Sequence, residues 1–165
     1  MKKIVLATAC FLLVMLCNVQ SQQKTITDEG RLFSINIPSN WMSTSSKNVW
    51  VTVYVFNDSM STDQLMMISS KNGKNLKDAY KANKKGQAGL KNFKLIEEGD
   101  SQINGEPCKW MVYTFNGKDG TAVKGKQCTL VKSGKGFILQ YILLETKFDA
   151  GKEAFEKVIT TLKLI

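Results

Sequence analysis

The segment from residue 93 to residue 145 constrains the fold most, because its pattern predicts four consecutive strands. We expect these strands at 93–100, 106–115, 121–132 and 136–145. Turn residues separate them, namely Asn104-Gly105, the stretch from Asn116 to Gly120, and the stretch from Ser133 to Gly136. Short strands joined by such turns form an antiparallel meander. The last strand is apolar on both faces from Phe137 to Leu144, which predicts a central place in the sheet.

The first half of the chain adds further strands to this pattern. Apolar and polar residues alternate from Phe33 to Ile37, as in a strand with one buried face. The stretch from Asn48 to Phe56 carries valine at every second position and aromatic residues or threonine between them, which suits a pleated sheet. Shorter strands are expected at 25–28 and 65–68.

Two segments follow a helical period instead. The first runs from Asn75, a good N-cap, to Leu90, and its inner stripe is Leu76, Ala79, Tyr80, Asn83, Gln87 and Leu90. Gly86 and Gly89 weaken its last turn. The second segment, 149–162, has its apolar stripe at Phe155, Val158, Ile159 and Leu162. The predicted fold class is therefore α+β, an antiparallel sheet of about six to seven strands flanked by two helices.

The N-terminus has the pattern of a secretory signal peptide. Lys2 and Lys3 precede an apolar run from Ile4 to Cys17, and the chain turns polar up to Ser21. The run is shorter than the ~20 apolar residues of a membrane span. We expect cleavage after Ser21, a single mature domain at 22–165 with no stable membrane span, and a periplasmic or extracellular location.

A lipid anchor is the less favoured alternative for this segment. Lipidation needs a cysteine that follows small residues at the end of the apolar run. Cys17 has the right position but follows Leu16, and Cys10 follows small residues but leaves a very short apolar run. Each cysteine satisfies one half of the requirement.

Charge and aromatic residues indicate two candidate interaction surfaces. Residues 1–21 contain two lysines and no acid, so their removal lowers the formal net charge from +9 to +7. Between residues 71 and 94 eight lysines are interrupted by one acid, Asp78. An anionic surface, a polysaccharide or an acidic protein could bind there, although a solvated helix face explains the same pattern. The candidate residues are Lys77, Lys81, Lys84 and Lys85, together with the aromatic stripe residues Trp50 and Tyr54, which a covering element could instead bury.

Cys108 and Cys128 are the cysteines of the predicted mature domain, and we expect them to form a structural disulfide. If the five residues from Asn116 to Gly120 form the loop, Cys108 lies directly opposite Cys128 in the hairpin. A three-residue loop, 118–120, would place the two cysteines diagonally instead. The alternative of a redox-active pair usually uses a Cys-x-x-Cys spacing, which is absent.

The residue types argue against catalysis. The chain contains no histidine, the commonest general base and metal ligand, and it has no Gly-x-Ser-x-Gly elbow. The acidic cluster of Glu97, Glu98 and Asp100 lacks the spacing of a calcium loop. We therefore expect a non-enzymatic protein without a cofactor or metal site, although a pair of catalytic carboxylates stays open as an alternative.

Several segments resemble the PsbP-like domain superfamily. The stretch from Phe33 to Trp41, FSINIPSNW, is similar to its strand-Pro-Trp entry, and the stretch from Ile103 to Tyr113 is similar to its I-x-G segment and following strand. The final strand and helix, 136–144 and 148–162, complete the resemblance, which covers most of 30–165. It implies an antiparallel sheet flanked by helices. It also implies an accessory or binding module. We expect its partner to be another exported or envelope protein, with an anionic surface as the alternative. Export and the few aromatic residues near the lysines argue against nucleic acid.

Overall fold

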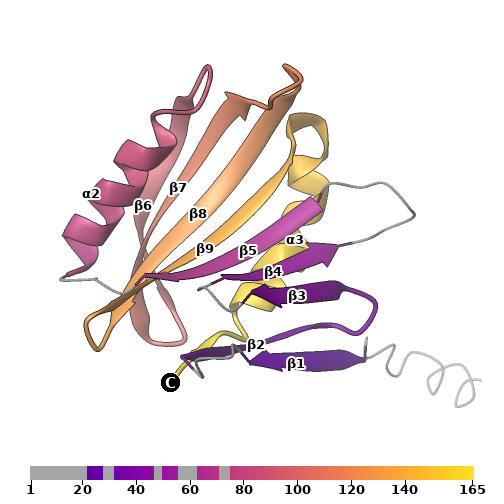
Figure 1. The fold of residues 1–165 in the computed structure, drawn as a ribbon, viewed down its shortest axis with the longest axis vertical. Coiled ribbons are helices and arrows are strands. Elements are labelled where there is room, and N and C mark those ends of the chain that lie inside the picture. Colours follow the sequence, from indigo (N-terminus) through magenta and orange to yellow (C-terminus); the bar gives the residue numbers. More distant parts are fainter. Residues whose placement is uncertain (1–21, 28–31, 47–49, 56–62, 71–74) are drawn as a thin grey trace, which may run out of the picture.

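A seven-stranded antiparallel sheet is the main layer of the fold (Figure 1). The computed structural model describes residues 22–27, 32–46, 50–55, 63–70 and 75–165, and side chains within 22–27, 32–43 and 75–165. The main sheet has the order β3-β4-β5-β9-β8-β7-β6. Its strands are β3 (Met42–Ser46), β4 (Trp50–Val55), β5 (Asp63–Ser70), β6 (Lys94–Ile103), β7 (Glu106–Asn116), β8 (Ala122–Lys132) and β9 (Lys135–Leu144).

The predicted meander is confirmed. Strands β6, β7, β8 and β9 pair with their sequence neighbours in antiparallel register. β9 occupies the middle of the sheet between β5 and β8, as its two apolar faces indicated. The predicted signal peptide and lipidation cysteines, in residues 1–21, lie outside the described residues.

A second, three-stranded sheet was not predicted as a separate layer. It has the order β1-β2-β10, with β1 at Gln23–Thr27, β2 at Phe33–Pro38 and β10 at Lys163–Leu164. β10 has only two residues, which is too short for a period-2 pattern to appear in the sequence. The predicted strands at 25–28 and 33–37 belong to this second sheet rather than to a single layer. The main sheet has seven strands because β3, which was not predicted, joins its edge.

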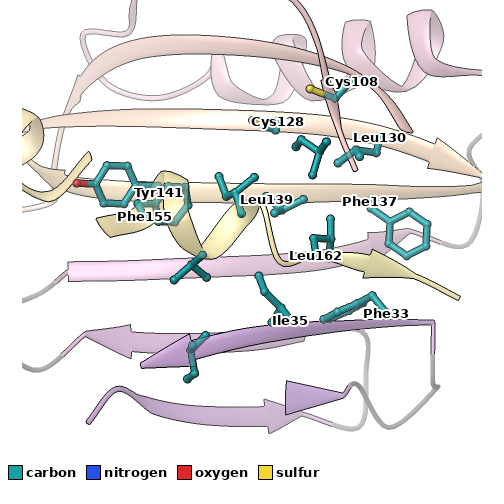
Figure 2. Close-up of a cluster of buried hydrophobic side chains, with 14 of the residues drawn as sticks. Phe33, Ile35, Cys108, Cys128, Leu130, Phe137, Leu139, Tyr141, Phe155 and Leu162 are labelled. Atoms are coloured by element: carbon teal, nitrogen blue, oxygen red, sulfur yellow. The ribbon is translucent and has the colours of Figure 1, made fainter. Parts of the chain in front are cut away.

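Helix α3, Phe148–Ile159, lies between the two sheets and closes the core; a 3-10 turn at Glu145–Lys147 precedes it. Figure 2 shows side chains from β2, β8, β9 and α3 converging on one cluster. Phe155 stacks on Tyr141 with ring centroids 4.2 Å apart. The alternating residues Phe33, Ile35 and Ile37 of β2 are buried against the same cluster, as the pattern predicted.

Helix α2, Leu76–Gln87, covers the opposite face of the main sheet through polar contacts. Asn75 caps it, because its side-chain oxygen accepts from the Asp78 N–H at 2.8 Å. None of its residues is fully buried. The Asn83 amide donates to Thr129 Oγ1 and the Gln87 amide to Gln127 Oε1, both at 3.1 Å. The predicted inner stripe therefore faces the sheet, but hydrogen bonds rather than apolar packing position the helix.

We predict that Gly151→Ala destabilises the protein. Gly151 lies in α3 against Tyr141 and Leu143, and an added Cβ would lie 2.7 Å from Leu143 Cδ1 and closer still to the Tyr141 hydroxyl. Both neighbours are buried and cannot withdraw. Overpacking of this kind costs about 1–3 kcal/mol, which urea unfolding followed by circular dichroism would measure. An unchanged midpoint would show that α3 does not pack this closely.

The matched substitution Gly86→Ala should have the opposite sign. Gly86 is also in a helix, but an added Cβ there meets nothing within 4 Å. Alanine in a helix is favoured over glycine by about 0.5–1 kcal/mol, so the free energy of unfolding should rise by about that amount. Destabilisation by Gly86→Ala would contradict the open environment of this position.

Candidate functional site

Cys108 and Cys128 lie diagonally on β7 and β8, so the predicted direct pairing is wrong. Cys108 faces Leu130, and Trp110 faces Cys128. The reason is the loop: the Gly117 N–H donates to the Thr121 carbonyl at 2.8 Å, which leaves only residues 118–120 as the turn. This is the three-residue alternative, and the register between β7 and β8 runs through without a bulge.

The predicted disulfide is also wrong, because both cysteines are free thiols in the structure. Their side chains point from one face of the sheet on adjacent strands. The interaction between the two thiols lowers the pKa of Cys108 and raises the pKa of Cys128. Burial raises the Cys128 pKa further, while the nearby Lys126 ammonium favours ionisation of both. Cys108 is therefore the thiol that ionises first.

The two thiols line a pocket of about 300 Å³ between the outer strands and the C-terminal end of α3. Apolar walls come from Ile103, Trp110 and Ile159, and its polar groups include Lys126 and Glu156. Helix α3 packs mainly on β9 and β2, and the pocket lies beside its C-terminal end. A solvent-open pocket with apolar walls and a few polar groups has the general character of a binding site.

Trp110 forms a flat wall of this pocket because its cross-strand partner is a glycine. Gly99 of β6 pairs with Trp110, and a Cβ at Gly99 would lie 2.9 Å from the indole Cζ2. The indole can therefore lie across the backbone of β6. Lys126 Nζ lies over the ring, 5.6 Å from its centroid, and the same nitrogen is 2.7 Å from Glu156 Oε1. Lys126 therefore contacts both the Trp110 ring and the Glu156 carboxylate, and the two contacts together fix its position.

A second polar cluster joins α2 to β6 and contains one of the predicted lysines. The Tyr80 hydroxyl donates to Glu98 Oε2 at 2.5 Å, and Lys84 Nζ donates to the same oxygen at 2.7 Å. The hydrogen bond from Lys84, followed by that from Tyr80, lowers the pKa of Glu98. Burial and the bond to Glu98 raise the pKa of Tyr80. Lys84 thus serves an internal contact and is not a free surface charge.

The other predicted interaction residues divide into two groups. Lys77, Lys81 and Lys85 are exposed, and no ion pair engages them among the described residues. The backbone of Trp50 and Tyr54 belongs to β4, which confirms the strand, but their side chains lie outside the described part of the chain. The role of Trp50 and Tyr54 in an interaction surface stays a prediction.

The pocket itself was missed from the sequence. Cys108 and Trp110 share one face of β7, and Lys126 and Cys128 share one face of β8, so strand periodicity could have grouped each pair. The contribution of Glu156 and Ile159 depends on where α3 docks, which no local pattern records.

None of the described helices is long and apolar enough to cross a membrane.

Comparison with known proteins finds relatives at the level of structure. No protein-family model and no curated protein sequence matches the chain. The solution structure of the cyanobacterial PsbP protein CyanoP from Synechocystis has a TM-score of 0.65 at 15% identity, covering 90% of this chain and 97% of that one. LpqN of Mycobacterium tuberculosis, described as involved in cell envelope biogenesis, has a TM-score of 0.61 at 14% identity, covering 87% and 90%.

A protein from Bacteroides thetaiotaomicron is also similar, with a TM-score of 0.64 at 21% identity. The match covers 87% of this chain and 49% of that one, so the chain spans about half of its length. At such identities the likeness concerns the fold. It agrees with the segments of sequence that resemble the superfamily, and the chain has a PsbP-like fold.

Proposed function

We propose that this chain is an exported, non-catalytic module that binds a partner protein of the cell envelope through the pocket beside α3. The observation that carries the proposal is the pocket itself, in which the Trp110 ring and the Lys126–Glu156 ion pair surround space for one partner side chain. Tryptophan is a typical anchor of protein interfaces. The N-terminal pattern of an exported protein and the description of LpqN agree with an envelope role.

The acidic groups support binding rather than catalysis. Glu156, the carboxylate of the pocket, forms an ion pair with Lys126 at 2.7 Å. Hydrogen bonds from Lys84, Thr121 and Lys157 lower the pKa values of three carboxyl groups, those of Glu98, Asp119 and Glu153. A carboxyl group that acts as a general acid near neutral pH needs a raised pKa. These acids therefore favour a role in ion pairs and turns.

We expect Trp110→Ala to weaken binding of the partner by about 10-fold or more, because it removes an aromatic anchor. The partner is first captured by the tagged protein from its own envelope fraction, and its dissociation constant is then measured with purified components. Phe115→Ala is the matched control, since Phe115 is a half-buried aromatic residue of the same strand on the opposite face.

A second variant keeps this test independent of folding. Thr160→Trp adds bulk at an exposed residue of the pocket rim and leaves the core intact. It should weaken binding as Trp110→Ala does, with an unchanged thermal unfolding midpoint. Normal affinity in both variants would rule out the pocket as the contact.

A second candidate function is binding to an anionic surface through the lysines on the outer side of α2. Lys77, Lys81 and Lys85 are spaced four residues apart and exposed, so they form a single positive row along the helix. Such a row attracts anionic lipid headgroups or polysaccharide by a force that salt screens.

The charge-reversal variant Lys77→Glu, Lys81→Glu, Lys85→Glu should lose co-sedimentation with anionic vesicles at low salt. The control reverses three exposed lysines elsewhere, Lys118, Lys135 and Lys152, so that both variants have the same net charge. Binding by the unmodified protein should also vanish near 1 M salt, where the screening length is about 3 Å. Equal loss in both variants would indicate a general charge effect and no site on α2.

A further inference from the structure

The proposed partner contact uses Trp110 and the Lys126–Glu156 ion pair, and it gives no role to the two free thiols that line the same pocket. Cys108 and Cys128 project from diagonal positions of adjacent strands on one face of the sheet. β7 and β8 are held on their outer sides by β6 and β9, so the backbone that carries both thiols is fixed. Both sulfur-bearing side chains line the pocket that opens to solvent.

We propose that Cys108 and Cys128 form a two-coordinate site for a soft monovalent metal ion, Cu(I). The proposal stands independently of the partner protein, because both ligands belong to this chain. Diagonal positions on adjacent strands and a shared pocket allow both side chains to turn toward one ion. The ion would reach them through the pocket beside α3.

The ligand set selects the class of ion. Thiolate sulfur is a soft ligand that favours Cu(I), whereas Ca²⁺ and Mg²⁺ require oxygen ligands. Structural Zn²⁺ takes four ligands in a tetrahedral arrangement. In the described part of the chain no three histidine, cysteine, aspartate or glutamate side chains converge on one point. A pair of sulfurs without a third ligand therefore suits an ion that accepts linear coordination.

The charges around the thiols are compatible with the complex that would form. Each thiol would release its proton to solvent as its sulfur binds Cu(I), so the copper bis-thiolate carries one negative charge and no electron is transferred. Lys126 lies two residues from Cys128 on the same face of β8 and lines the same pocket. Its ammonium offsets that charge, while Glu156 and Asp100 oppose it from α3 and β6. The ion pair with Glu156 keeps the ammonium close to the site.

The test uses the full chain with Cys10→Ser and Cys17→Ser, so that Cys108 and Cys128 are its only thiols. The reduced protein is titrated with Cu(I) without oxygen, in competition with a coloured Cu(I) chelator. We expect one ion per chain. We also expect Cys108→Ser or Cys128→Ser alone to reduce the affinity by more than the roughly 10–100-fold that loss of an outer-shell contact costs. Zn²⁺, titrated in parallel, should bind far more weakly.

X-ray absorption at the copper edge provides a measurement that needs no substitution and so does not depend on how the variants fold. Two sulfur neighbours at a single distance would support the site, and nitrogen or oxygen neighbours would overturn it. Unchanged Cu(I) affinity in the variant that lacks both cysteines would also overturn it. A disulfide between Cys108 and Cys128 in protein isolated from its native compartment would overturn it as well, if adding Cu(I) together with a thiol reductant does not reduce that disulfide.

Discussion

The packing of α3 against β9 is the contact on which the rest of the structure depends. Phe155 stacks on Tyr141, and Gly151 lets the helix backbone approach the Tyr141 and Leu143 side chains. The helix then brings its C-terminal end, followed by β10, onto the small sheet, where β10 pairs with β2. One helix therefore joins the two sheets, and the position at which it docks decides which part of the main sheet stays uncovered.

The two faces of the main sheet are held by different forces. The face toward α3 is apolar and contains the buried cluster of β2, β8, β9 and α3. The face toward α2 carries the buried polar residues Gln127, Thr129 and Gln140, and Gln140 donates to the Tyr113 hydroxyl. Hydrogen bonds are directional, so they fix the position of α2 more narrowly than apolar contact would. Among the described residues, Gln127 Nε2 is the buried side-chain nitrogen without a partner.

The positive charge of the chain is divided between structural and solvent-facing lysines. Lys84 and Lys126 are engaged with Glu98 and Glu156 and join a helix to a strand on either face of the sheet. Exposed ion pairs contribute little to stability by themselves, so their main effect is to orient side chains. The lysines on the outer side of α2 have no such contact among the described residues and keep their charge toward solvent. Composition alone could not make this distinction.

The sequence by itself determined most of the elements, whereas no pattern predicted β3 or β10. The period-2 pattern of β2, the two apolar faces of β9 and the i, i+3, i+4 stripe of α3 depend on local spacing, and all three are present as predicted. The length of the β7–β8 turn, which the sequence left open, decided the cysteine geometry, because the turn 118–120 makes Leu130 rather than Cys128 the partner of Cys108. Tertiary structure decided the pocket, whose residues come from β6, β7, β8 and α3. Local patterns record which face of an element is buried, whereas a site between elements depends on where they dock, which is set by long-range packing.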